Sequence, residues 1–196
     1  MSKHQPLILA SSSPRRRELL ERLHIPIEIH PADVDETPRK NEHAKNMVLR
    51  LAKDKAVKVS KEFPNRWVLA SDTTVALDGK PIGKPTSASD AKRTLKTIRG
   101  KRHQVYTAIC LQNGKKIYAL VDTTDVILRR MTDKEIAWYV KTGEPMDKAG
   151  SYAIQGVGGL FVKGIKGSYS NVMGLPVEKT AELLKTTRLL DRLLMA

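Results

Sequence analysis

A pair of long apolar runs separated by an Asn-Gly step constrains the fold more than any other feature of the chain. The runs VYTAICLQ (105–112) and KIYALVDTTDVILR (116–129) are strand-like, and Asn113-Gly114 between them is a strong hairpin signal. We therefore predict two long antiparallel strands joined by a tight turn.

The first half of the chain alternates short apolar runs with segments of helical periodicity. Strands are expected at residues 7–10, 26–31 and 67–70, helices at 14–23, 41–61 and 88–98, and a further hairpin around Asp78-Gly79. Beyond the long strands we expect a helix from Thr132-Asp133, a glycine-rich stretch from Gly143 to Gly174 and a final helix after Pro176. The alternation favours an α/β fold with a mixed, twisted sheet. Because no linker is long enough to separate independent units, we predict one domain over residues 1–196, with two lobes and a cleft between them.

The charge of the chain favours an anionic partner. Lys and Arg number 35 against 21 Asp and Glu, which gives a formal charge of +14. Nucleic-acid-binding proteins usually concentrate basic residues in a tail or stripe, or interleave them with aromatic residues. Here the basic residues are spread along the chain and aromatic residues are only 5% of it, so a small phosphorylated ligand is favoured over a stable nucleic-acid partner.

The N-terminal sequence MSKHQP lacks the apolar run of a signal peptide, and no stretch approaches eighteen consecutive apolar residues. These observations predict a cytoplasmic protein with no membrane partner. Cys110 is the single cysteine, which excludes an internal disulfide, and we expect it to be a buried small hydrophobic residue.

The stretch SSSPRRREL (11–19) places cations where a helix is least favourable to them. Pro14 suits the first helical position and Ser13 the cap before it, so the three following arginines fall in the first turn, at the positive end of the helix dipole. Backbone N–H groups, serine hydroxyls and guanidinium groups all bind phosphate oxygens, and a bound phosphate would offset the conflict. The alternative is a solvated basic helix start.

Two acidic stretches are candidates for the chemistry. In LASDTTV an apolar strand is expected to end at Ser71-Asp72-Thr73, where Asp72 could hold a metal ion or activate water, or could simply close an Asx-turn. In DVDETP (33–38) three carboxylates precede a proline, which suits Mg²⁺ or Mn²⁺ but is also typical of a polar loop.

Other polar residues are weaker candidates when they are taken singly. Lys55 and Lys84 could bind phosphate or be exposed charges, and Gln155 lies in DKAGSYAIQGVGG, a loop of small residues that could pass close to a flat ligand. The chain has no Walker P-loop, no GxSxG nucleophile elbow and no histidine pair at metal-ligand spacing.

In this order, SSSPRR, DVDETP, RLAKDKA, SDTTV, GKP, DKAGSYAIQG and NVMGLP resemble the Maf family of nucleoside triphosphate pyrophosphatases, from about Leu7 to Leu184. The resemblance implies a mixed α/β fold like that of inosine triphosphate pyrophosphatases (Maf/Ham1), elongated, with a cleft between two lobes and often a homodimer. It also implies hydrolysis of a nucleoside triphosphate to the monophosphate and pyrophosphate with a divalent cation. Family members are associated with restraint of septum formation in bacteria.

The resemblance assigns roles residue by residue. Asp72 matches the proton acceptor of the family, and Glu36 matches one of its polar active-cleft residues. We predict that Glu36 and Asp72 together are the metal ligands. The phosphate- and substrate-binding positions are Ser11, Arg15, Arg16, Lys55 and Lys84. Arg17 matches no site of the family and is expected to be solvated.

The family divides by substrate at three positions, which are Arg15, Thr73 and Gln155 here. The branch that looks like this chain prefers dTTP and UTP, whereas the branch acting on 7-methyl-GTP carries Trp, Gln and Glu there. A Gln amide can accept from and donate to the imide edge of thymine or uracil, while Glu suits the donors and positive charge of methylated guanine. We therefore expect removal of unwanted or modified pyrimidine nucleotides.

Two alternatives stay open. One is a pyrophosphatase for 7-methyl-GTP or another modified nucleotide. The other is a nucleic-acid-binding or cell-division regulatory protein in which hydrolysis is incidental. The pairing of SSSPRR with SDTT disfavours the regulator, because a pure binding protein does not need a carboxylate beside a phosphate cradle.

Overall fold

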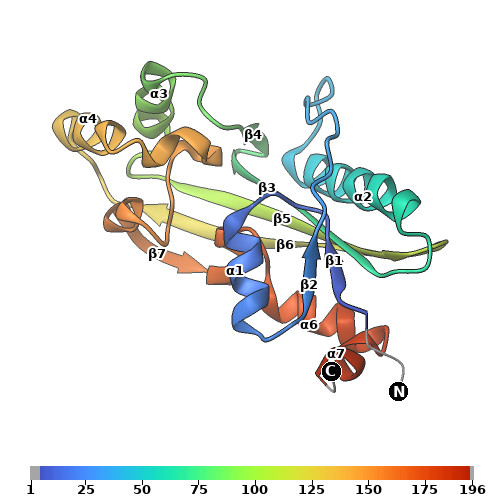
Figure 1. Ribbon diagram of the computed structural model, residues 1–196. Helices are drawn as coiled ribbons and strands as arrows, with labels where there is room; N and C mark the ends of the chain where they lie inside the picture. The colour runs from blue at the N-terminus through green and yellow to red at the C-terminus, as the bar shows by residue number, and fades with distance from the viewer. Residues whose placement is uncertain (1–4, 195–196) are drawn as a thin grey trace.

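The predicted hairpin forms the centre of the sheet. In the computed structural model, which describes residues 5–194, β5 (Arg102–Asn113) and β6 (Lys116–Leu128) pair antiparallel from Asn113 opposite Lys116 to Arg102 opposite Ile127. Gly114 in the turn has a φ of +54°, a conformation that favours glycine. The antiparallel hairpin is therefore confirmed (Figure 1).

The sheet has seven strands in the order β2-β1-β3-β5-β6-β7, with β4 paired to β3. The remaining strands are β1 (Leu7–Leu9), β2 (Ile27–Ile29), β3 (Val68–Leu77), β4 (Lys80–Ile82) and β7 (Val162–Lys166). Strand β1 runs parallel to both β2 and β3, and the other pairs are antiparallel. The prediction of a mixed sheet is confirmed.

The expected end of a strand at Ser71-Asp72-Thr73 is wrong. Strand β3 continues to Leu77 because β5 pairs with it from Val68 to Ala76. On its other edge β3 pairs with β1 only at Val68 and Leu69. Asp72 therefore lies just past the end of β1, inside β3, rather than at the carboxyl end of its own strand.

The helices follow the predicted periodicity closely. They are α1 (Pro14–Arg22), α2 (Ala44–Glu62), α3 (Ala88–Ile98), α4 (Asp133–Lys141), α5 (Tyr169–Met173), α6 (Val177–Thr186) and α7 (Leu189–Leu194). The glycine-rich stretch also contains three short 3-10 turns, η1 (Glu144–Asp147), η2 (Ala149–Ser151) and η3 (Val157–Phe161). The expected final helix divides into α6 and α7 at Arg188, whose φ is +54°.

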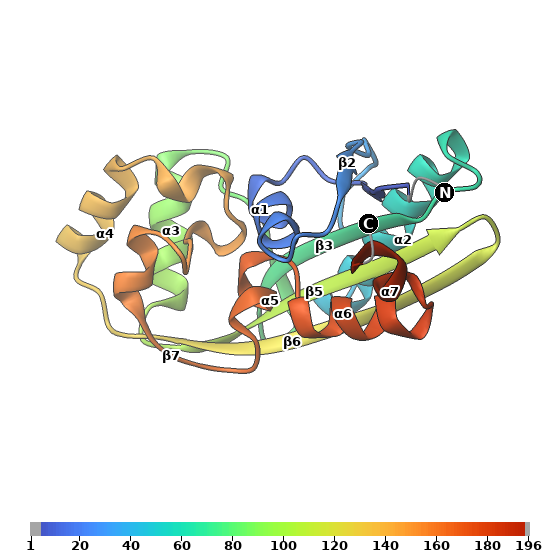
Figure 2. The ribbon, with the colours of Figure 1, turned by 60° about the horizontal axis from the view of Figure 1, so that its bottom comes forward.

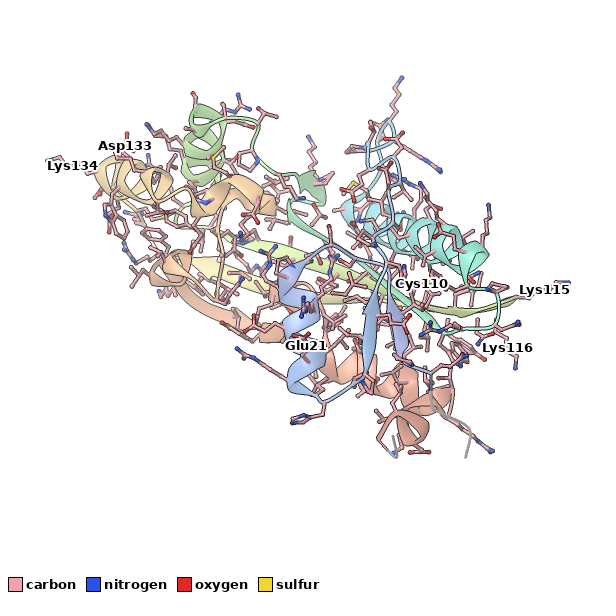
Figure 3. The ribbon with its side chains drawn as sticks, viewed as in Figure 1. Glu21, Cys110, Lys115, Lys116, Asp133 and Lys134 are labelled. Atoms are coloured by element: carbon pink, nitrogen blue, oxygen red, sulfur yellow. The ribbon has the colours of Figure 1, made fainter. Side chains whose placement is uncertain are left out.

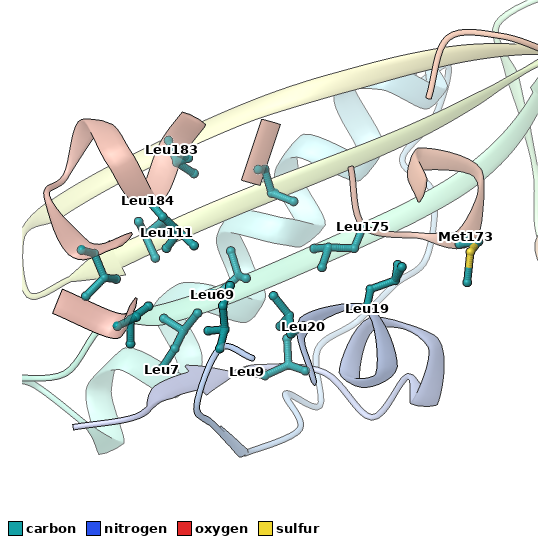
Figure 4. Close-up of a cluster of buried hydrophobic side chains, with 14 residues drawn as sticks. Leu7, Leu9, Leu19, Leu20, Leu69, Leu111, Met173, Leu175, Leu183 and Leu184 are labelled. Carbon is teal, nitrogen blue, oxygen red and sulfur yellow. The ribbon is translucent and has the colours of Figure 1, made fainter. Parts of the chain in front are cut away.

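The helices cover the two faces of the sheet differently. Helix α2 buries its apolar side against one face, where alternate residues such as Ala70 and Ala108 join its core. The opposite face has two cores, and Figure 2 shows α6 and α7 in front of β5 and α3 and α4 towards the other end. The core at the first end contains leucines from β1, α1 and α6 (Figure 4), and the core at the other end packs α3 and α4 on β5 and β6.

The hairpin makes the molecule long. In Figure 3, Lys115 in the β5–β6 turn and Lys116 at the start of β6 mark one end, and Asp133 and Lys134 at the start of α4 mark the other. Cys110 lies between these ends with no exposed surface, and burial raises its pKa to about 11. The expectation that Cys110 is a buried small hydrophobic residue is confirmed. None of the helices within residues 5–194 combines the length and the hydropathy that a membrane span requires.

Candidate active site

A cleft of about 290 Å³ opens at the edge of β3 just past the end of β1. Its walls come from the start of α1, from α2 and β3, from the segment around η2, and from the end of α5. All nine residues that the sequence singled out line it: Ser11, Arg15, Arg16, Glu36, Lys55, Asp72, Thr73, Lys84 and Gln155.

Arg16 joins three parts of this wall. Its guanidinium donates to the carbonyl of Gly174 at 2.8 Å, to Ser11 Oγ at 3.0 Å and to Thr73 Oγ1 at 3.0 Å. Gly174 has a φ of +111°, which favours glycine and turns this carbonyl towards Arg16. Burial lowers the pKa of Arg16, as does neighbouring Arg15, while Asp72 and Glu36 oppose the shift. A guanidinium remains protonated despite this shift, so Arg16 brings a fixed positive charge to the cleft.

The start of α1 differs from the sequence prediction in one detail. Ser13 occupies the cap position, but its hydroxyl makes no capping hydrogen bond, and its own N–H donates to Ser11 Oγ at 3.2 Å. The N–H groups of the first turn therefore keep their capacity to donate to an anion. Arg17 instead pairs with Glu21 at 2.7 Å on the exposed side of the helix, as expected for an arginine outside the site.

Lys55 bridges two carboxylates at the opposite wall. Its Nζ lies 2.6 Å from Asp72 Oδ1 and 2.5 Å from Glu36 Oε1. Because both contacts are short, Lys55 brings the carboxylates of Asp72 and Glu36 close together. Lys55 and Asp72 are both buried, and α2 and β3 hold them in register, whereas Glu36 reaches in from the acidic loop before α2.

The two carboxylates have opposite pKa shifts. Burial raises the pKa of Asp72, although the charges of Lys55 and Arg16 work against this rise. Burial acts in the same sense on Glu36, but the hydrogen bond and charge of Lys55, together with the charges of Lys84 and Arg16, outweigh it and lower the pKa of Glu36. A carboxyl with a raised pKa beside one that stays ionised is an arrangement found in acid–base chemistry.

Successive residues of β3 face opposite sides of the sheet. Asp72 points to α2, whereas Thr73 Oγ1 lies 3.0 Å from Thr107 Oγ1 and accepts from Arg16. Because β3 has an open edge here, the cleft reaches both faces of the sheet. Lys84 and Gln155 are exposed residues at its rim, one after β4 and the other in the turn between η2 and η3.

Among the further lining residues, three titratable ones were not singled out from the sequence: Asp147, Lys148 and Tyr152. Asp147 lies 3.7 Å from Arg15 and also contacts Lys148, and Tyr152 donates to or accepts from the buried His103 at 2.8 Å. All three lining residues belong to the quoted stretch DKAGSYAIQG, but nothing in its spacing separates residues that face the cleft from residues that do not.

The carboxylates of the cleft suit a divalent cation only in part. The converging carboxylates of Glu36 and Asp72 already hold one positive charge, the Lys55 ammonium. No cluster of three or more His, Cys, Asp or Glu residues suited to a metal occurs within residues 5–194. Mg²⁺ and Mn²⁺ are often held by one or two carboxylates together with substrate phosphates, so the residues present fit such an ion once a polyphosphate is bound.

Comparison with known proteins identifies the family of the chain. The family described as Maf-like protein matches residues 6–187. A relative from Anaeromyxobacter dehalogenans, named dTTP/UTP pyrophosphatase, is 50% identical over 184 residues, which cover 91% of this chain and 92% of the relative. A relative of the same name from Myxococcus xanthus is 49% identical over 179 residues and covers 91% of each chain.

The fold has a solved counterpart. A HAM1 protein from Coxiella burnetii superposes with a TM-score of 0.52 at 15% identity, over 92% of this chain and 98% of that one. The prediction of a Ham1-like mixed α/β fold is confirmed. With its family match over most of its length and relatives about half identical to it, the chain belongs to the Maf-like protein family.

Proposed function

We propose that the protein is a nucleoside triphosphate pyrophosphatase that hydrolyses dTTP and UTP to the monophosphate and pyrophosphate. The observation that carries the proposal is a buried carboxylate, Asp72, in the same cleft as the cationic start of α1. The names of the two relatives support the choice of substrate. A protein that only bound nucleotides would not need a buried carboxylate beside its phosphate site.

Asp72 is the proposed general base. Lys55 donates to Oδ1, and we assign Oδ2 to the water that attacks the α-phosphorus. The raised pKa of Asp72 improves its ability to accept a proton in the transition state. The electron pair of the breaking bond passes to the bridging oxygen, which leaves as part of pyrophosphate.

The cations would stabilise the charge that develops on the phosphate oxygens. Arg16 is held in place by its three hydrogen bonds, so its orientation is fixed before substrate arrives. Ser11 and Arg15 line the same wall, and Lys84 lies at the rim. A divalent cation held by Glu36 and Asp72 would neutralise further phosphate charge, as the family resemblance implies.

Substrate selection is proposed to involve Arg15, Thr73 and Gln155. The Gln155 amide can pair with both the acceptor and the donor of a uracil or thymine edge. Thr73 contacts Arg16 and Thr107, so its contribution would pass through the position of Arg16.

A nucleotide screen tests the proposed activity. Purified protein is incubated with the common nucleoside triphosphates and 7-methyl-GTP in Mg²⁺ or Mn²⁺, and phosphate is measured with and without added inorganic pyrophosphatase. We expect signal with dTTP and UTP that depends on the added enzyme. Preference for 7-methyl-GTP would contradict the substrate assignment, and cleavage of no nucleotide would contradict the activity.

The proposal also covers the domain organisation and the location of the protein. We propose that the two lobes form one domain, since β5 supplies side chains to the cores of both. Nucleoside triphosphates are cytoplasmic metabolites, which supports a cytoplasmic location that cell fractionation would check. No stable nucleic-acid partner is proposed.

A homodimer is supported by the outer edge of β6. Within the described chain, β7 pairs with β6 only from Asp125 onwards, which leaves the edge from Lys116 to Asp122 without a strand partner. An antiparallel copy with Ala119 opposite Ala119 would set Lys116 against Asp122 and Ile117 against Val121. The side chain of Ile117 is exposed, which is a liability for an unpaired edge.

The dimer prediction is checked by light scattering. We expect the wild-type protein to have the mass of a dimer and Ala119→Pro to have that of a monomer. In the alternating pattern of the ladder, the N–H of Ala119 points away from β5, so proline would block edge pairing and leave the hairpin intact. A monomeric wild-type protein at micromolar concentration would rule the dimer out.

A further inference from the structure

The loop that carries Gln155 is anchored by a carboxylate that lies outside the cleft. Gln155 is exposed at the rim, in the turn between η2 and η3, and its own side chain has no partner among the hydrogen bonds of residues 5–194. An exposed side chain on a free loop would sample many positions and would discriminate poorly between bases. The position of Gln155 therefore depends on what holds its backbone.

Glu144 holds the loop on the C-terminal side of Gln155. Its Oε2 accepts from the N–H of Val157 at 2.9 Å, and its Oε1 accepts from the N–H of Gly158 at 2.9 Å. Both oxygens of one carboxylate thus bind two successive N–H groups at the start of η3. Such charge-assisted bonds are stronger than those between neutral groups.

Tyr139 extends this anchor to the N-terminal side of Gln155. Its hydroxyl donates to Glu144 Oε1 at 2.7 Å and accepts from the N–H of Ala153 at 3.2 Å. Tyr139 has no exposed surface and packs against Phe161 in the core. The two ends of the short segment 153–157 are therefore tied to the buried Tyr139 and to the partly buried Glu144, which Tyr139 links to the core.

The packing at Gly156 shows how closely the loop approaches this carboxylate. A Cβ built on Gly156 would lie 2.1 Å from Glu144 Oε2 and 2.7 Å from its Cδ, closer than any side chain could come. The φ of Gly156 is −114°, so the need for glycine here is one of space and not of backbone conformation.

Glu144 is kept ionised at its place. Burial works against ionisation, but the Tyr139 hydroxyl and the N–H groups of Gly158 and Val157 outweigh it, so the pKa of Glu144 is lowered. The ionised form has no proton to donate, which is required of a group that faces three donors. Glu144 does not line the cleft among the described residues, so it is not placed to touch a nucleotide.

We infer that Glu144 is a positioning residue for base recognition, which sets the place of Gln155 through the backbone of residues 153–158. This inference rests on the proposed function, because it assumes that Gln155 reads the base. It assigns Glu144 no part in the chemical step. Its loss should therefore change which nucleotide is selected and leave turnover nearly unchanged.

A double-mutant cycle tests the inference. The variants are Glu144→Gln, Gln155→Ala and the double variant, and the measurement is the ratio of kcat/KM for UTP to that for GTP. Glu144→Gln is expected to lower this ratio by up to about tenfold, because it misplaces the neutral amide of Gln155 against the base. The change should appear as a higher KM for UTP. In the Gln155→Ala background the same substitution should lower the ratio no further.

Two additional variants make the result specific. Glu135→Gln changes a carboxylate in the same lobe that also accepts a backbone N–H, that of Thr132 at 2.7 Å, but does not contact the Gln155 loop, so it should keep the wild-type ratio. Tyr139→Phe removes the bonds to Glu144 and Ala153 and keeps the ring in the core. Tyr139→Phe should shift the ratio in the same direction as Glu144→Gln. It tests the inference in place of Glu144→Gln if that variant does not fold.

The outcomes separate the inference from the proposed function. If Gln155→Ala lowers the ratio and neither Glu144→Gln nor Tyr139→Phe does, the inference is wrong and the proposed function stands. Additive losses in the double variant would also overturn the inference, because Glu144 would then act by another route. A wild-type protein with no preference for UTP over GTP overturns both.

Discussion

Replacing Asp72 by Asn is expected to lower kcat for UTP by about a thousandfold, the loss typical of removing a general base. The amide keeps the size of the carboxylate but cannot accept a proton from water at Oδ2. At saturating Mg²⁺, KM should change little, because Glu36 can still hold the divalent cation and the cations at the start of α1 remain in place. Steady-state kinetics of pyrophosphate release measure both parameters.

The pH profile distinguishes loss of a base from loss of shape. Burial raises the pKa of Asp72, so the acid limb of kcat/KM should lie at a higher pH than an exposed aspartate would give, with activity lost as pH falls through that pKa. This limb should disappear in Asp72→Asn. Asp54→Asn, which alters an exposed aspartate next to Lys55 on α2, is the matched control and should keep both the rate and the limb. Turnover of Asp72→Asn within a few-fold of the wild type would refute the role.

Replacing Arg16 by Lys is expected to lower kcat/KM by about a hundredfold, the effect of losing an oriented donor in a preorganised site. Lysine keeps the charge, but it cannot serve the carbonyl of Gly174 and the hydroxyls of Ser11 and Thr73 from one planar group. The unsatisfied partners should also lower the free energy of unfolding by about 1–3 kcal/mol. Urea denaturation measures that loss.

Arg17→Lys is the control for this substitution. Arg17 is the next residue of α1 and pairs with Glu21 in solvent, so its replacement should change the free energy of unfolding by less than about 0.5 kcal/mol. Equal effects of the two variants would refute the special role of Arg16. The same denaturation curves should show a single transition, and two separate transitions would contradict the single-domain proposal.

The elements that the sequence predicts best are those with local causes. The turn at Asn113-Gly114 is chemically specified, and the periodicity of α2 and α3 follows from which residues face the sheet. The extent of β3 could not be foreseen, because it depends on pairing with β5, which is distant in the chain. The polar residues of LASDTTV consequently looked like the end of a strand.

The sequence predicted which residues belong to the candidate site, but not which of them contact one another. The resemblance and the residue types named nine of the residues that line the cleft, but no spacing could reveal that Lys55 lies between Asp72 and Glu36. Glu144 was not singled out at all. A lone glutamate before Pro145 in a glycine-rich stretch carries no periodic signal, and its partners become neighbours only when η3 folds back towards it.

The alternation of side chains along β3 has a consequence for how such an enzyme can diverge. Asp72 and Thr73 are adjacent in sequence, yet one is braced by α2 and the other by β5 and α1. A substitution at position 73 can therefore change which nucleotide is bound without disturbing Asp72 and its role in hydrolysis. An insertion or deletion of one residue before Asp72 would interchange the two sides at once. Along this strand, point substitution is a route to new substrates, and a change in chain length is not.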